Sequence, residues 1–145
     1  MQGFIFLEIV LSSLLLTIGI PSFQTLIQGN RIINVGSTIR HSLMFTCSQP
    51  VNLMSYVTVC PLNGNICGND WINRLDIFID NDQDKIFSSD DIKLKTAVPF
   101  NIIDTLTFPT TTITFTPDGH ITGSMALFRY CTGDQRVGVK ITFRG

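Results

Sequence analysis

Apolar residues are unevenly distributed along this chain, and their spacing changes twice. From Phe4 to Ile20 the sequence reads FIFLEIVLSSLLLTIGI, apolar with one acid, Glu8. As a helix this run would extend about 25 Å, slightly less than the roughly 30 Å hydrocarbon core of a membrane. Extending the helix through Pro21 to Ile27 makes it long enough to span a bilayer.

The predicted helix continues further, but its apolar residues now lie on one side. They recur at steps of three and four residues, as expected for a helix face that packs against another element: Ile32, Val35, Ile39 and Leu43. Pro50 lacks the backbone N–H that a helix needs and disfavours helix in the preceding residue. We therefore expect the helix to end near Ser48 or Gln49.

Beyond Pro50 the pattern changes to short runs rich in Val, Ile, Thr and Phe, separated by turn residues. The predicted strands are residues 55–60, 74–80, 91–96, 105–108, 111–116, 125–131 and 137–143. The pattern thus predicts an α+β fold. One long N-terminal helix packs on a mostly antiparallel β-sheet head, which wraps the C-terminal half of the helix.

The composition also indicates that part of this chain does not face water, since only 14% of its 145 residues are charged. A cleaved secretory signal peptide is the simplest alternative for the first apolar run. Such a peptide has a basic region before the run and a small-residue cleavage site after it, and neither is found here. An isolated charge in hydrocarbon costs several kcal/mol, so Glu8 should have a partner.

These N-terminal residues resemble the type IV pilin-like proteins. Their signature is a Gly before the processing site, an aromatic residue after it, and a Glu as fifth mature residue; Gly3, Phe4 and Glu8 fit this pattern. The resemblance implies that prepilin peptidase cuts between Gly3 and Phe4 and methylates the new N-terminus. Glu8 would then neutralise the amino group of a neighbouring subunit's Phe4, because a buried carboxylate needs a cation.

The head is similar to minor pilins of the FimT/FimU type, which are related to GspH pseudopilins. The likeness runs through residues 57–61 (VTVCP), Cys67 with 70–71 (DW), 75–80 (LDIFID), 113–119 (ITFTPDG) and 128–131 (FRYC). It implies a leader at residues 1–3, a transmembrane and filament-core half-helix at 4–27, and a head at 28–145. The head would lie in the periplasm on a single-pass inner-membrane anchor, and later in a pilus at the cell surface.

The implied function is structural: assembly of a type IV pilus or its tip complex, with twitching motility, adhesion or DNA uptake as consequences. The implied partners are other pilin and minor pilin subunits, the inner membrane and prepilin peptidase. Two alternatives stay open. The chain could be a DNA-binding tip subunit of a competence pilus, or a GspH-like pseudopilin of type II secretion.

Four cysteines are an even number, which fits disulfides in an exported protein. Cys60 and Cys67 are close enough to close a small loop, and we interpret them as a disulfide. Cys47 and Cys131 either pair with each other or stay free. Zinc is disfavoured because no C-x2-C spacing is present.

The segment 80–84 (DNDQD) resembles the start of a calcium loop. Its sixth residue is Lys85 where such loops have Gly, and its twelfth is Asp91 where they have Glu. We therefore favour an exposed turn rich in Asp and Asn, and expect no metal. His41 and His120 lack a nucleophile–acid partnership, so we expect neither catalysis nor a cofactor.

Basic residues gather near the C-terminus. Arg136, Lys140 and Arg144 are spaced by four, so a regular strand would place all three on one face. Some FimT-type proteins bind DNA through residues in this region, so these three are candidates for salt-dependent contact with the phosphates of double-stranded DNA. The alternative is a solvated strand face, because three charges make a thin patch.

Overall fold

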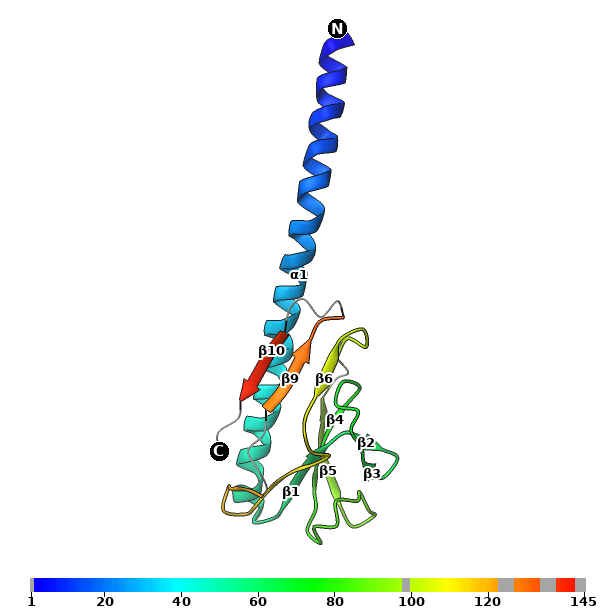
Figure 1. The fold of residues 1–145 in the computed structure, drawn as a ribbon. Helices are drawn as coiled ribbons and strands as arrows, with labels where there is room; N and C mark the ends of the chain where they lie inside the picture. Colours follow the sequence, from blue (N-terminus) through cyan, green and yellow to red (C-terminus); the bar gives the residue numbers. More distant parts are fainter. Residues whose placement is uncertain (1, 98–99, 123–126, 134–137, 143–145) are drawn as a thin grey trace.

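The computed structural model describes residues 2–97, 100–122, 127–133 and 138–142. One helix, α1 (Gln2–Leu53), projects far beyond a β-rich head (Figure 1). Its first half stands clear of every described strand, and its C-terminal half packs against the head. This arrangement confirms the predicted α+β fold.

The strands of the head form two main sheets and a small hairpin, where the sequence predicted a single sheet. The larger sheet has the order β5–β4–β1–β7–β8, and all its described pairs are antiparallel. Its strands are β1 (Val57–Cys60), β4 (Leu75–Ile79), β5 (Ile92–Ala97), β7 (Ile113–Phe115) and β8 (Ile121–Thr122). The second sheet, in the order β10–β9–β6, consists of β6 (Thr105–Thr107), β9 (Leu127–Cys131) and β10 (Gly138–Thr142).

The hairpin pairs β2 (Leu62–Asn63) with β3 (Ile66–Cys67). All seven predicted strands form within a few residues of their expected ends. The structure adds β2, β3 and β8, which are two residues long and therefore too short to show any periodicity.

The main core lies between α1 and the larger sheet. The predicted apolar face of the helix is confirmed, because Val35, Ile39 and Leu43 are buried there. Burying each such side chain stabilises the fold by about 1.5–3 kcal/mol. Trp71 completes this core and joins the two sheets: its ring makes edge-on contacts with Phe108, after β6, and Phe128, in β9.

Strand β4 buries both of its faces, and the two faces differ. Leu75, Ile77 and Ile79 belong to the main core beside α1. Phe78 belongs to a second, smaller core under the hairpin, with Cys60 and Leu62. Because side chains alternate along a strand, Asp76 and Asp80 share the face of Phe78. Both acids are completely buried.

The expected helix end at Ser48 or Gln49 is wrong, because α1 continues through Pro50 to Leu53. Pro50 lies in the last turn, where its missing N–H removes a single helical bond, and its ring is buried in the head. The residue that follows the helix, Met54, has a left-handed backbone with a φ of 50°. The next amide, Ser55 N–H, donates back to the Pro50 carbonyl at 3.2 Å. This is a Schellman ending, although it usually carries Gly at the left-handed position.

Candidate assembly surface and polar clusters

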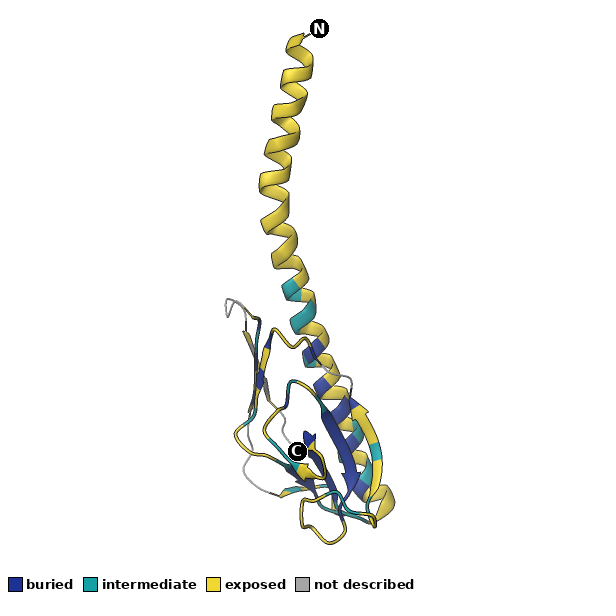
Figure 2. Ribbon diagram, turned by 90° about the vertical axis from the view of Figure 1, so that its right-hand side faces the viewer, coloured by how far each residue is buried: buried dark blue, intermediate teal, exposed yellow. Residues whose placement is uncertain are grey.

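The first half of α1 is an apolar surface that the described protein leaves uncovered. Every residue from Gln2 to Ile27 is exposed, as the long yellow part of the helix in Figure 2 shows. Phe4 is 84% exposed and Phe6 is 73% exposed. The helix contains an 18-residue window with a mean hydropathy of 2.2, so by length and composition it can cross a membrane.

Glu8 lies within this apolar surface, one turn beyond the predicted processing site at Gly3 and Phe4. Its side chain is exposed and has no ion-pair partner among the described residues. The backbone carbonyl of Glu8 accepts a hydrogen bond from the Ser12 hydroxyl at 2.8 Å, which does not involve the carboxylate. A counter-ion for Glu8 would therefore have to come from outside the described part of this chain.

The helix is tied to the head just beyond this surface, at the buried carboxylate of Asp104. Arg31 donates to both of its oxygens, at 3.1 and 3.2 Å. The Tyr130 hydroxyl, from β9, also donates to it, and so does the backbone N–H of Gly133 at 2.9 Å. Burial and the hydrogen bond to Asp104 raise the pKa of Tyr130, so this hydroxyl stays a donor.

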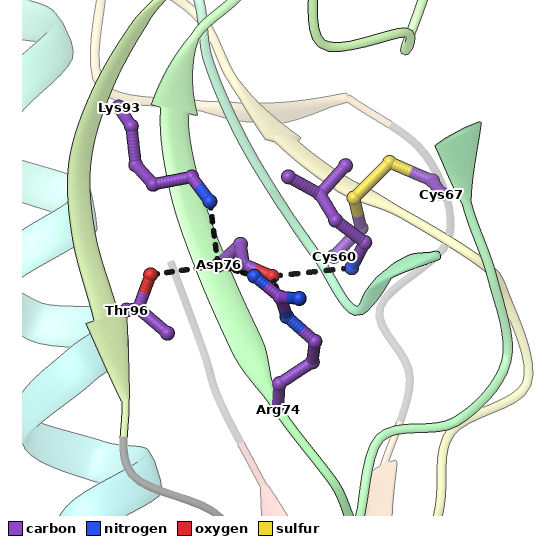
Figure 3. Close-up of polar contacts among 7 residues, drawn as sticks. Cys60, Cys67, Arg74, Asp76, Lys93 and Thr96 are labelled. Atoms are coloured by element: carbon purple, nitrogen blue, oxygen red, sulfur yellow. Dashed lines mark hydrogen bonds and ion pairs between the residues drawn. A yellow bond between two sulfur atoms is a disulfide. The ribbon is translucent and has the colours of Figure 1, made fainter. Parts of the chain in front are cut away.

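The carboxylate of Asp76, on β4, accepts hydrogen bonds from four groups (Figure 3). Arg74 donates at 2.9 Å, Lys93 at 3.2 Å, Thr96 at 2.7 Å and the backbone N–H of Leu62 at 3.2 Å. Burial by itself would raise the pKa of Asp76. The hydrogen bonds from these four donors, Arg74 first, outweigh it and hold the pKa below its usual value.

A disulfide between Cys60 and Cys67 closes the hairpin, with an S–S distance of 1.98 Å. Gly68 N–H donates to the Pro61 carbonyl at 2.8 Å across the same loop. The alternative pairing of Cys47 with Cys131 is not formed, and both are free and half-buried. Cys47 lies on α1 with its sulfur 4.0 Å from the Gly119 carbonyl, whereas Cys131 is the last residue of β9.

Asp80, directly after β4, is surrounded differently from Asp76. Its Oδ2 accepts the Thr58 hydroxyl at 2.8 Å, whereas its buried Oδ1 has no hydrogen-bond partner among the residues that the structure describes. One carboxylate oxygen from each of Asp80, Asp82 and Asp84 lies within 4.8 Å of the other two. Burial, followed by the Asp82 carboxyl group and the charge of Asp91, raises the pKa of Asp80, although the Thr58 hydroxyl and the Lys85 backbone amide oppose the shift.

Of the three predicted DNA-contacting residues, Lys140 is exposed on β10. Its neighbour across the strand pair is Arg129 on β9, which is also exposed. Arg136 and Arg144 lie outside the described residues.

Sequence reasoning missed the clusters around Asp76 and Asp104. Asp76 carried a signal, because an acid inside the strand run LDIFI must be neutralised if both faces of that strand are buried. The partners could not be read from the chain, because Lys93 and Thr96 come from the next strand of the sheet. Asp104 lies in a turn, where an acid is ordinary, so it gave no signal.

Comparisons with known proteins agree with this architecture. The family described as type II transport protein GspH matches residues 36–145. The solved structure of type IV minor pilin FimU from Pseudomonas aeruginosa PAO1 superposes with a TM-score of 0.55 at 18% identity. The match covers 73% of this chain and 75% of that one, and it shows a shared fold. No curated protein sequence matches the chain.

Proposed function

The chain belongs to the GspH family, and on that premise we propose that it is a structural subunit of a pilus-type filament, anchored in the inner membrane before assembly. In this role residues 4–27 are embedded in lipid and later in the filament core. Residues 28–145 form the head outside the cytoplasm. Its expected partners are other pilin and minor pilin subunits.

The observation that carries this proposal is the contrast along α1. The helix is continuous from Gln2 to Leu53, yet its large apolar side chains are all exposed along the first half, whereas the second half buries one apolar face, at Val35, Ile39 and Leu43. An apolar surface of this length needs a cover of lipid or other apolar helices. The Arg31–Asp104 ion pair holds the head to the helix at the junction between the two halves.

Glu8 supplies the specificity of assembly in this proposal. A carboxylate among apolar helices is costly unless a cation neutralises it. Cleavage after Gly3 would create a new amino group at Phe4, and the same group on a neighbouring subunit would be the counter-ion for Glu8. The pair would fix how far one helix is displaced along the next.

Replacing Glu8 with Ala tests this role. We expect the Glu8→Ala protein to remain in the membrane fraction but to be lost from sheared filaments, because no group then neutralises the neighbour's amino group. Ser12→Ala is the matched control, since it removes an exposed polar group one turn further along the helix and should leave incorporation unchanged. Normal incorporation of Glu8→Ala would remove the pairing role.

Processing is tested separately by mass spectrometry of the protein isolated from membranes. The expected species begins at a methylated Phe4 and carries the Cys60–Cys67 disulfide. A mature protein that begins well beyond Pro21 would show that the apolar helix is cleaved off, and would overturn the anchor.

A type II secretion pseudopilin is the second candidate, because the matching family is described by that transport role. Co-purification of the cross-linked protein distinguishes the two machines, since secretion components would be recovered in one case and pilus components in the other.

DNA binding stays a prediction that rests on Lys140 among the described residues. A salt-dependent gel shift that is unchanged in Lys140→Ala would remove Lys140 from the binding surface.

A further inference from the structure

The loop after β4 contains a buried oxygen atom that no group in the described part of the chain satisfies. Asp80 is completely buried, and its Oδ1 accepts no hydrogen bond from the described residues. Buried polar atoms in folded proteins nearly always have a partner, so an orphan atom calls for an explanation. For an ionised carboxylate the natural missing partner is a cation, because burial makes an uncompensated charge costly.

Two exposed acids face this buried one from the same loop. One carboxylate oxygen from each of Asp80, Asp82 and Asp84 lies within 4.8 Å of the other two. Calcium binds oxygen at about 2.3–2.6 Å, so a single ion between three such oxygens can contact all of them. Asp84 also holds the loop in shape, because its Oδ1 accepts the Ile86 N–H at 2.7 Å and leaves the second oxygen for a ligand.

We propose that residues 80–91 form a calcium-binding loop in which Asp80, Asp82 and Asp84 supply carboxylate ligands. Backbone carbonyls, water and Asp91 are the candidates for the remaining positions. Asp91 lies at the other end of the loop, where its Oδ2 accepts the Ser88 N–H at 2.7 Å. Calcium suits this set better than magnesium, which requires near-ideal octahedral geometry and keeps several waters.

The sequence departs from the calcium-loop pattern at two positions, Lys85 and Asp91, and the structure shows that the first departure does not prevent the loop conformation. Lys85 occupies the position where calcium loops have Gly, yet its φ of 61° is the left-handed conformation that Gly usually provides. The second departure limits the affinity: Asp91 is shorter than the usual Glu. We therefore expect a dissociation constant of about 10⁻⁴–10⁻³ M, the range of extracellular calcium modules.

Binding at this loop would reinforce the smaller core of the head. Phe87, within the loop, makes an edge-on contact with Phe78 at 5.5 Å between ring centroids. Its backbone N–H donates to the Asn65 carbonyl at 2.7 Å, which connects the loop to the disulfide-closed hairpin. An ion that holds residues 80–91 in place therefore also holds the hairpin against β4.

Thermal unfolding of the full chain in detergent micelles tests the proposal, with CaCl2, MgCl2 or NaCl added at equal ionic strength after treatment with a chelator. We expect 10 mM CaCl2 to raise Tm by about 5 °C, with saturation, since a ligand that binds only the folded state stabilises it. Magnesium should give a clearly smaller rise. Equal rises with all three salts would show charge screening alone and overturn the proposal.

Variants then locate the effect. Asp82→Asn combined with Asp84→Asn should lose most of the calcium-dependent rise, and both residues are exposed, so the variant should fold. Asp70→Asn combined with Asp118→Asn is the matched control, since it removes the same charge from two exposed acids outside the loop and should keep the full rise. A full rise in the first pair would overturn the site. Neither measurement depends on filament assembly, so the proposed function is tested separately.

Discussion

Asp76 and Asp80 lie four residues apart, on the same face of one chain segment, and both are completely buried. Asp76 receives hydrogen bonds from two cations, a hydroxyl and a backbone amide, and its pKa is lowered. Asp80 receives one from a hydroxyl and faces other acids, and its pKa is raised. The two equally buried acids thus have opposite pKa shifts, because the neighbouring groups determine which charge state is favoured.

This difference distinguishes two roles that a buried acid can have, a structural role and a binding role. At Asp76 the partners come from β4, β5 and the hairpin, so the carboxylate joins three elements and has no capacity left for a ligand. At Asp80 the protein supplies part of the compensation and leaves one oxygen orphaned. The first arrangement is structural, and the second is what a binding site needs before its ligand arrives.

The largest effect is expected at the structural acid. Asp76→Asn should lower the free energy of unfolding by about 3 kcal/mol, because Arg74 and Lys93 lose their shared counter-ion below the hairpin. Both cations are partly exposed, which keeps the loss at the low end of values for buried pairs. Chemical denaturation in detergent micelles measures it, with the exposed Asp118→Asn as control. A loss no larger than that of the control would show that Asp76 does not join the hairpin to the sheet.

Sequence patterns could predict the parts of this fold that depend on periodicity. The apolar half-helix and the buried face at Val35, Ile39 and Leu43 follow from spacing, and the seven longer strands follow from runs of β-forming residues between turn residues. The helix end could not be predicted, because a left-handed Met54 and the burial of Pro50 depend on tertiary packing. The carboxylate clusters were missed for a related reason: apart from Arg74 beside Asp76, their donors lie far away in sequence, as Arg31 does from Asp104.

Removing one hydroxyl beside each acid sharpens the comparison. Thr96→Val leaves Asp76 with three donors, so we expect a loss of about 1 kcal/mol in the free energy of unfolding. Thr58→Val leaves Asp80 without its hydroxyl donor and also breaks the Thr58–Thr114 contact of 3.0 Å. We expect a loss of about 2 kcal/mol there, in the presence of a chelator. Equal losses would mean that the two acids depend equally on their hydroxyl partners.

The lowered pKa of Asp76 determines whether its contribution to folding stability rises or falls with pH. Between its folded and unfolded pKa values the unfolded chain binds more protons, so stability rises with pH. The contribution of Asp76 is therefore complete above the unfolded value of about 3.9 and is lost as pH falls through the lower folded value. The slope reaches at most about 1.4 kcal/mol per pH unit. Unfolding curves below pH 4 should be steeper in pH for the wild-type protein than for Asp76→Asn, and parallel curves would contradict this.

The smallest effect is expected at Asp80, and its sign depends on the solution. Asparagine keeps an oxygen for the Thr58 hydroxyl and removes the charge that burial, Asp82 and Asp91 all oppose. With a chelator, Asp80→Asn should change the free energy of unfolding by less than about 1 kcal/mol, toward greater stability. With 10 mM calcium the order should reverse, because only the wild-type protein then gains a counter-ion. If the variant loses as much stability with a chelator as Asp76→Asn does, Asp80 is a structural acid too, and the contrast between them fails.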